Sequence, residues 1–346
     1  MIKKIILITI ITFITFGVIA CSSNSGEALI DTARNGDLET AKLLIENGTD
    51  INANDKDGVT DLMQASENGN LETVKDLVER KRVNINAKDE DGYTSLMYAS
   101  FNGNLEIVKY LVENGADVNA RVDNDWTALE FASGKGHLEI VKFLIENYAE
   151  IDAKDNNGNT ALMYASISGN LEIVKYLLEN GADINSKNDD GVTALLNASY
   201  KGQLEIVKYL IENGADINTN DKDGVTDLMQ ASAFGNLEMV KYLIEDIEVD
   251  INEKDNIDRT ALIVASFNGH LKIVKFLIEN GADVNIKNNY GITALIYAAE
   301  HRNLEIVKYL VEKGANVNIK DNHGRTALDL AETEEIKKVL RKVGAK

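Results

Sequence analysis

The segment DGYTSLMYASFNGNLEIVKYLVENGADVNA, residues 91–120, returns with few changes along most of this chain. Its counterpart at residues 157–186 reads NGNTALMYASISGNLEIVKYLLENGADINS. One threonine recurs at intervals of 33 residues, or of 34 in two cases, at Thr60, Thr94, Thr127, Thr160, Thr193, Thr226, Thr260, Thr293 and Thr326. Such a period is typical of stacked units that bury a face only against their neighbours. We therefore predict one elongated repeat domain whose function lies on its repeated outer surface.

The charge of the chain limits its partners. The 346 residues include 36 Lys and Arg against 56 Asp and Glu, a net charge of -20. Nucleic acids and anionic lipid surfaces attract basic patches, so this balance argues against either as the main partner. A simpler interpretation, that acidity keeps a long surface soluble, needs no partner at all.

The first twenty residues differ from the rest. Lys3 and Lys4 precede an uncharged apolar stretch over residues 5–19, which is the arrangement of a secretory signal. Fifteen residues are few for a membrane span, which needs about 17 to 25. Cys21 follows, and because it is the only cysteine it cannot form an internal disulfide.

This leader, ending in VIAC at residues 18–21, resembles that of bacterial lipoproteins. The resemblance implies lipidation of Cys21, cleavage before it, and attachment to a membrane of the bacterial cell envelope by acyl chains; two chains suffice for stable anchoring. Residues 1–20 would form the lipoprotein signal peptide and residues 21–26 a short tether. An ordinary cleaved signal and an uncleaved anchor helix remain alternatives. Inner or outer membrane, and periplasmic or surface side, stay open.

Each repeat contains two short helical patterns. The first follows the threonine, whose hydroxyl suits a helix N-cap, and includes Leu96 and Ala99 in the quoted copy. Gly103 ends it. A second pattern presents one apolar stripe over residues 105–112 and closes at Gly115. The remainder is rich in Asn and Asp and predicts a turn.

Turn, helix and helix in 33 residues is similar to the ankyrin repeat. The resemblance implies an all-α ankyrin-repeat solenoid, with a helix-turn-helix and a β-turn or hairpin-like loop in each unit. It covers residues 27–346 in about ten repeats. We expect an N-terminal cap at 27–56, repeats at 57–90, 91–123, 124–156, 157–189, 190–222, 223–256, 257–289 and 290–322, and a C-terminal cap at 323–346.

Several positions depart from the family pattern. The usual proline after the threonine is replaced, for example by Asp61, and the usual histidine two places later by residues such as Met97. Tyr148 and Arg302 stand where two glycine columns predict Gly, and we expect a local distortion at each. Two repeats that begin DGVTDLMQAS carry an extra residue five units apart, which suggests duplication of a five-repeat block or coincidence in a uniform array.

The positions of the aromatic side chains indicate a candidate binding surface. Seven of them share one position of the second helix and are interpreted as structural, whereas eleven fall in the turn or the first helix, columns that face partners in the ankyrin family. Tyr and Trp concentrate binding energy. We predict a partner-binding site formed by Tyr93, Tyr98, Phe101, Trp126, Phe131, Tyr164 and Tyr200. The alternative is that these residues pack between neighbouring first helices.

Catalytic and metal-binding patterns are weak. The four histidines form no nucleophile and base pair, so we predict no catalytic residue, no cofactor and no enzyme. The turn at residues 220–224 is similar to a calcium loop, but Thr219 and Gln230 occupy the first and twelfth positions, where an EF-hand needs acids. No metal site is predicted.

Together these features predict a monomeric, non-enzymatic protein-protein interaction scaffold. It would be lipid-anchored in the bacterial cell envelope and bind a protein partner, not nucleic acid, through the concave ankyrin groove. Alternatives are an exported or surface-exposed effector or adhesin that binds a host protein, a periplasmic stress-protection protein, and a mechanical spacer.

Overall fold

The computed structural model describes residues 25–80, 82–217 and 219–345. The predicted signal peptide and Cys21 lie outside these residues. Within them the chain forms twenty helices and no strand, apart from an isolated antiparallel bridge between Asn54 and Thr60. The all-α class is confirmed. Ser25 and Gly26, expected to end the tether, already belong to the first described helix.

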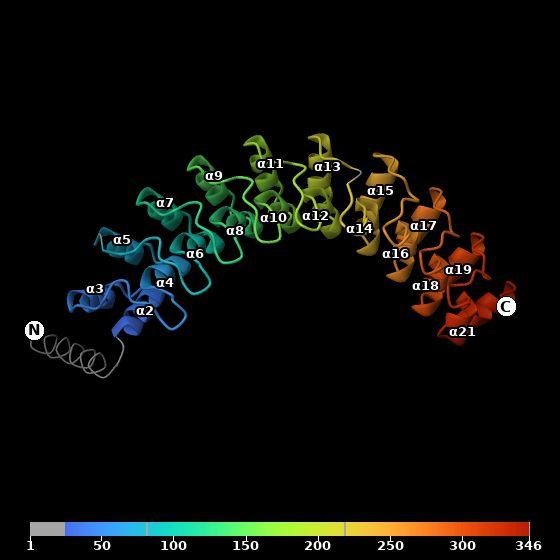
Figure 1. Cartoon of the computed structure of the whole chain (residues 1–346), viewed down its shortest axis with the longest axis horizontal. Coiled ribbons are helices and arrows are strands. Elements are labelled where there is room, and N and C mark those ends of the chain that lie inside the picture. Colours follow the sequence, from blue (N-terminus) through green and yellow to red (C-terminus); the bar gives the residue numbers. More distant parts are fainter. Residues whose placement is uncertain (1–24, 81, 218, 346) are drawn as a thin grey trace, which may run out of the picture. The chain divides into compact units, whose positions relative to one another are not determined.

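The chain divides into two compact units, residues 1–156 and 157–346, here called the N-terminal and C-terminal units. The described helices of the N-terminal unit are α2 (Ser25–Asn35), α3 (Leu38–Glu46), α4 (Asp61–Glu67), α5 (Leu71–Glu79), α6 (Ser95–Asn102), α7 (Leu105–Glu113), α8 (Ala128–Lys135) and α9 (Leu138–Glu146) (Figure 1). Those of the C-terminal unit are α10 (Ala161–Ser168), α11 (Leu171–Glu179), α12 (Ala194–Lys201), α13 (Leu204–Glu212), α14 (Asp227–Ala233), α15 (Leu237–Glu245), α16 (Ala261–Phe267), α17 (Leu271–Glu279), α18 (Ala294–Glu300), α19 (Leu304–Glu312), α20 (Ala327–Leu330) and α21 (Glu334–Lys342).

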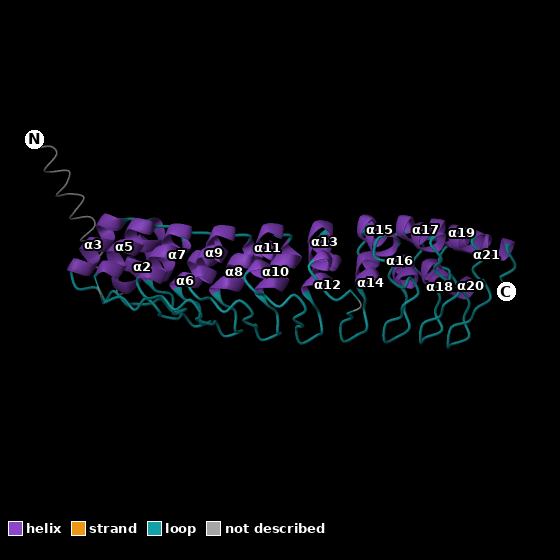
Figure 2. Ribbon diagram, turned by 90° about the horizontal axis from the view of Figure 1, so that it is seen from above, coloured by secondary structure: helices purple, strands orange, loops and turns teal. Residues whose placement is uncertain are grey.

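Within each unit the helices form two layers. Even-numbered helices, the first of each repeat, pack side by side on the inner side of the curve, and odd-numbered helices cover the outer side (Figure 1). The turns between repeats project from one edge, beyond the first helices (Figure 2). The inner surface of each unit is therefore made by first helices and turns.

Short helices of seven to nine residues predominate, and such lengths are marginal in water on their own. Packing supplies the missing stability: Leu96, Val108 and Leu111 are 1%, 0% and 0% exposed, and their columns are buried in most repeats. Thr94 caps α6 as predicted, with its Oγ1 accepting from the backbone N–H of Met97 at 3.4 Å.

One polar column joins successive repeats. In most repeats the residue before the second helix reaches back to a carbonyl at the end of the first helix of the preceding repeat. Asn104 Nδ2 donates to Ser66 O at 2.7 Å, and His137 Nε2 lies 3.1 Å from Phe101 O. We call this residue the clasp. It provides a side-chain hydrogen bond between successive repeats.

The expected distortions at Tyr148 and Arg302 are not found. Both residues adopt the left-handed backbone of the glycines they replace, with φ of 67° and 61°. At Gly103, which has the same repeat position as Arg302, an added Cβ would lie 2.6 Å from the ring of the clasp His137. The final repeat places no clasp over Arg302, so its side chain has room, and its Nε donates to Glu332 at 2.7 Å. The backbone therefore keeps the repeat geometry at Tyr148 and Arg302. The cost is the free energy of a left-handed conformation in a residue that has a Cβ.

Candidate protein-binding surface

Five aromatic side chains meet on the inner surface of the N-terminal unit. They come from α6, α8 and the turns before them, and we call Tyr93, Tyr98, Phe101, Trp126 and Phe131 the aromatic cluster. The Phe131 ring centroid lies 5.5 Å from that of Tyr93, 5.9 Å from that of Phe101 and 4.9 Å from that of Trp126. These separations suit favourable aromatic pairing. The structure thus brings together five of the seven predicted binding residues.

Phe131 cannot serve as a contact residue as predicted. It is only 5% exposed because the surrounding rings cover it. Phe101 is 40% exposed, with Lys135 Nζ 4.2 Å from its ring centroid, and Tyr93 and Trp126 are partly exposed. Phe131 therefore supports the other rings from beneath.

A hydrogen bond fixes the edge of the cluster. The Tyr98 hydroxyl donates to Asp89 Oδ2 at 2.7 Å, while Asp89 Oδ1 accepts from the backbone N–H of Tyr93 at 2.8 Å. Burial, together with this bond to a carboxylate, raises the pKa of Tyr98 above its ordinary value. One turn aspartate thus holds both tyrosines in place.

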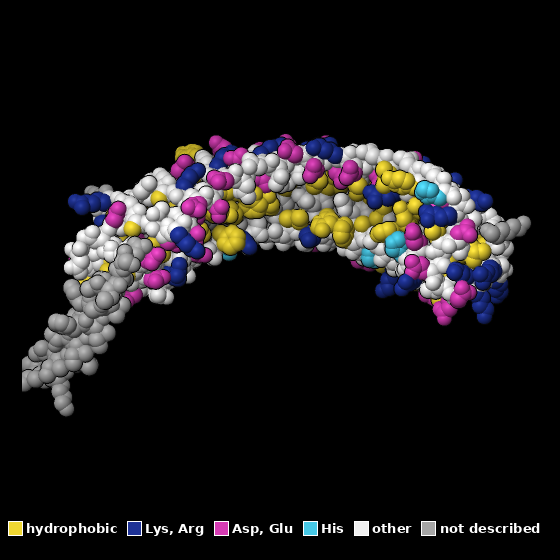
Figure 3. Space-filling view, turned by 60° about the horizontal axis from the view of Figure 1, so that its bottom comes forward, with side chains coloured by type: hydrophobic (Ala, Val, Ile, Leu, Met, Phe, Trp, Pro, Cys, Tyr) yellow, Lys and Arg dark blue, Asp and Glu magenta, His cyan; other side chains and the backbone are white. Residues whose placement is uncertain are grey.

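Tyr164 and Tyr200, the other two predicted residues, lie in the C-terminal unit. Tyr164 is on α10, and its hydroxyl accepts from Asn159 Nδ2 at 3.4 Å. Tyr200, on α12, packs edge-on against Phe234 with centroids 4.3 Å apart. Phe234 is 51% exposed, so this pair also reaches the surface. Figure 3, which brings the first-helix side forward, shows hydrophobic side chains gathered on this face within both units.

A second hydrophobic group in the C-terminal unit was not singled out from sequence. Phe267 on α16 lies 5.2 Å from Tyr297 and 4.3 Å from His301, measured between ring centroids. Phe267 and Tyr297 border a cleft of about 380 Å³. The column positions of both rings were visible in the sequence, but the cleft depends on turns from two repeats.

Three buried carboxyl groups were also not predicted. Asp61 and Glu130 are 0% exposed and Asp227 is 2% exposed. One oxygen of Asp61, one of Glu130 and both of Asp227 have no hydrogen-bond partner. Burial raises the pKa of each to about 7. The sequence offered one signal, since Asp61 and Asp227 replace the family's proline.

The surroundings of these acids differ. Asp61 Oδ1 accepts from the backbone N–H of Leu62 at 2.8 Å, and Glu130 accepts from that of Thr127 at 2.6 Å, which lowers their pKa less than burial raises it. Ser199 lies close enough to lower the pKa of Asp227 slightly, but no hydrogen bond of good geometry joins them.

The described residues offer little for metal chemistry. His137 and His270 are clasps, with Nε2 atoms 3.1 and 2.9 Å from carbonyl oxygens of the preceding repeat. Across residues 25–80, 82–217 and 219–345, no group of three or more His, Cys, Asp or Glu side chains could hold a metal ion. In the same part of the chain no helix has the length and hydropathy to cross a membrane.

Stacked helix pairs joined by projecting turns define a helical repeat protein of the solenoid class. A family model described as "Ankyrin repeats (3 copies)" matches residues 29–122, 119–188, 151–221, 195–288 and 262–345. Because these matches cover most of the chain, it belongs to the ankyrin-repeat family. Among curated proteins, none matches this sequence. Ankyrin repeats imply an interaction scaffold that binds protein, and such proteins are generally not enzymes.

Proposed function

We propose that this protein is a non-enzymatic scaffold that binds a protein partner across the first-helix face, with the aromatic cluster as its main contact. The observation that carries the proposal is the convergence of five aromatic side chains from two successive repeats. Large, rigid rings bury much area at low entropic cost, which is why they dominate binding energies in many interfaces.

The cluster is held in place before a partner arrives. Phe131 supports three rings from beneath, and Asp89 fixes Tyr93 and Tyr98. Binding therefore loses little side-chain entropy. Phe101 and Lys135 add an exposed apolar ring beside a cation. These features favour a partner surface with both apolar and acidic groups.

Replacing Tyr93 and Trp126 together by alanine should weaken capture of the native partner roughly ten-fold or more, because two partly exposed anchors are lost. Capture would be measured by quantitative pull-down from crosslinked envelopes. Tyr176→Ala, on the outer α11, is the matched control and should leave capture unchanged. Circular dichroism melts would confirm that the variants fold. Undiminished capture by the double variant would exclude the cluster as the contact.

The proposal includes attachment to a bacterial envelope membrane through Cys21. Its support is the lipoprotein-like leader, whose Cys21 lies four residues before the first described helix, which begins at Ser25. Four residues of extended chain reach at most about 14 Å, so the first repeat would stay beside the lipid headgroups. A scaffold held there would meet partners of the envelope.

We expect the chain expressed in bacteria to incorporate radiolabelled palmitate, and Cys21→Ser to lose that label because the chain has no other cysteine. Membrane fractionation should show the variant released or retained only as precursor. Equal labelling of both proteins would contradict lipidation at Cys21. Protease added to intact cells would then distinguish a surface-exposed adhesin or effector, which is digested, from a periplasmic protein.

A further inference from the structure

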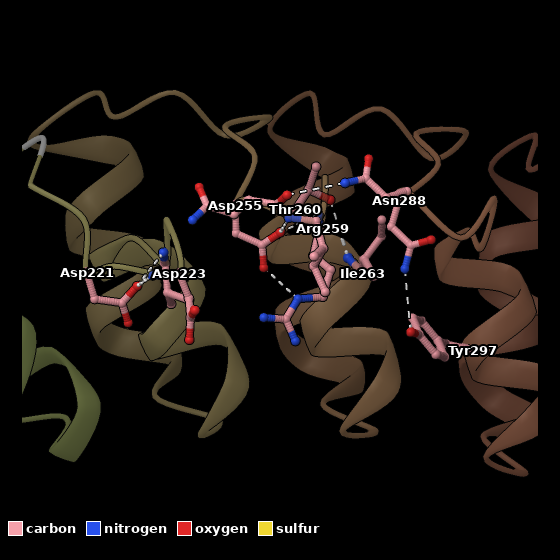
Figure 4. Close-up of polar contacts among 12 residues, drawn as sticks. Asp221, Asp223, Asp255, Arg259, Thr260, Ile263, Asn288 and Tyr297 are labelled. Carbon is pink, nitrogen blue, oxygen red and sulfur yellow. Dashed lines mark hydrogen bonds and ion pairs between the residues drawn. The ribbon is translucent and has the colours of Figure 1, made fainter. Parts of the chain in front are cut away.

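The cleft lies in the C-terminal unit, whereas the aromatic cluster lies in the N-terminal unit. It is bounded by α14, α16 and α18 and by the turns before α14 and α16, and its volume is about 380 Å³. That size suits a side chain or a short peptide segment. Figure 4 shows Arg259 between the turn that carries Asp221 and Asp223 and the ring of Tyr297.

The floor of the cleft is apolar. Met229 and Ile263 are 2% and 1% exposed, whereas Phe267 is 43% exposed and forms part of the wall. Tyr297 continues this wall, with its ring centroid 5.2 Å from that of Phe267. A long aliphatic stem would therefore find an apolar bed.

One charge pair within the cleft is already satisfied. Asp255 Oδ2 accepts from Arg259 Nε at 2.5 Å, and Asp255 Oδ1 accepts from the backbone N–H groups of Ile257 and Arg259 at 3.0 and 2.7 Å. The Asp255 side chain is 1% exposed. Arg259 is thus neutralised and fixed, so it does not dominate the local charge.

Asp221 lies in the turn five residues before the repeat threonine, Thr226. The residues at this position in other repeats, here called the Asp221 column, normally have two sets of hydrogen-bond partners. The first oxygen accepts from the turn backbone, as Asp221 Oδ1 does from Asp223 and Val225, both at 2.9 Å. In several repeats the second oxygen of this residue, or the amide nitrogen where it is Asn, forms a hydrogen bond with another side chain. These pairs are Asp89 with Tyr98, Asp255 with Arg259, Asp321 with Arg325 and Asn288 with Tyr297.

Asp221 lacks the second kind of partner. Of the residues that the structure describes, no side chain donates to its Oδ2 and no lysine or arginine pairs with Asp221 or with the exposed Asp223. Both carboxylates border the cleft beside its apolar floor. Two unpaired negative charges next to an apolar bed match a long cationic side chain.

We propose that this cleft binds a peptide segment of a partner protein through an arginine side chain. The guanidinium group donates to Asp221 and Asp223, its stem lies on Met229 and Phe267, and an apolar neighbour in the peptide covers the exposed part of Phe267. Arginine fits because its planar group pairs with carboxylates in a fork and stacks on aromatic rings. This site rests on the proposed scaffold function, but its residues belong to the C-terminal unit and those of the aromatic cluster to the N-terminal unit.

The other repeat that begins DGVTDLMQAS provides a matched control. Asp55 and Asp57 occupy the same positions as Asp221 and Asp223 in a repeat of nearly identical sequence. There the nearby pocket is lined by Glu27, Asp31, Arg34 and Lys56, and its lining includes no aromatic side chain like Phe267 or Tyr297. Asparagine is compatible with the column, because Asn288 Oδ1 accepts the same two turn N–H groups, from Tyr290 and Ile292, at 3.0 and 2.9 Å.

The test pans a random twelve-residue peptide library on the full chain and measures each enriched peptide by fluorescence polarisation. We expect enrichment of peptides with an arginine beside an apolar residue. Asp221→Asn with Asp223→Asn should weaken their binding at least ten-fold, and so should arginine-to-citrulline replacement in the peptide. Asp55→Asn with Asp57→Asn should change it less than two-fold, and binding should weaken with added salt.

Three results would overturn the cleft proposal: no enrichment of arginine peptides, equal loss in both double variants, or unchanged binding of citrulline peptides. The Tyr93 and Trp126 double variant separates this proposal from the scaffold function. It should bind the arginine peptides normally while losing its native partner. If capture of the native partner depends on the aromatic cluster but no arginine peptide binds, the cleft proposal is wrong and the scaffold function stands.

Discussion

Asp227→Asn should make the protein markedly more stable at pH 8 and leave it nearly unchanged at pH 4. The carboxyl group is 2% exposed, and burial raises its pKa from 3.8 to about 7. Well below pH 4 the group is protonated in both the folded and unfolded chain, so it costs nothing. As the pH rises through 4 to 7 the unfolded chain releases the proton first, and stability is lost. Above pH 7 the loss is complete.

The expected gain at pH 8 is up to about 4 kcal/mol, the free energy that corresponds to this change of pKa. Asp61→Asn should behave in the same direction, since burial also raises its pKa to about 7. Denaturant titrations between pH 4 and 8 and hydrogen exchange of α14 would measure the effect; exchange is needed because repeat arrays can unfold in parts.

Asp190→Asn is the matched control, because that side chain is exposed and its nearest cation, Lys222 Nζ, lies 3.8 Å away. We expect it to change stability by less than about 0.5 kcal/mol at either pH. A pH profile of Asp227→Asn that runs parallel to the wild type would show that Asp227 is ionised at little cost in the folded protein.

Gly103→Ala should destabilise the N-terminal unit by roughly 2 to 4 kcal/mol through backbone strain and overpacking. Gly103 has φ of 81°, and an added Cβ would lie 2.6 Å from the ring of the clasp His137. Relieving that contact moves the ring away from Phe101 O, so the inter-repeat contact is lost as well. Urea unfolding would measure the change.

Gly115→Ala in the same repeat measures the free-energy cost of the left-handed backbone without the clash. Its φ is 95°, but nothing lies within 4 Å of an added Cβ, so a loss of about 1 to 2 kcal/mol is expected. A double-mutant cycle with His137→Ala should show that removing the ring recovers part of the cost of Gly103→Ala. Equal losses at Gly103 and Gly115 would exclude the clash.

Local sequence features were sufficient to predict the helices of each repeat. Thr94 and Gly103 mark the start and end of α6 because capping and left-handed backbone depend on residues close in sequence. The columns of Tyr93, Phe101 and Trp126 likewise predicted that these side chains share a face. Anchoring through Cys21 stays a prediction, since it lies outside the described residues.

Side-chain burial depended on neighbours one repeat away. Phe131 and Phe101 belong to the aromatic columns, yet one is 5% and the other 40% exposed, because rings from two repeats close over Phe131. Asp227 stands out in the sequence only by replacing the family's proline, and its burial at 2% exposure is seen only in the folded chain. Such effects require the stacking of units, which a single repeat does not contain.

By itself the sequence determined the repeat period, the helix pairs and the family, because each follows from local capping and from the spacing of apolar residues. Only the tertiary structure decided which polar groups have partners: the clasp over Gly103, the unpaired oxygen of Asp221 and the buried carboxyl of Asp227. Those differences arise between repeats of nearly identical sequence, because a single side chain in the neighbouring repeat determines how exposed a polar group is and whether it has a partner.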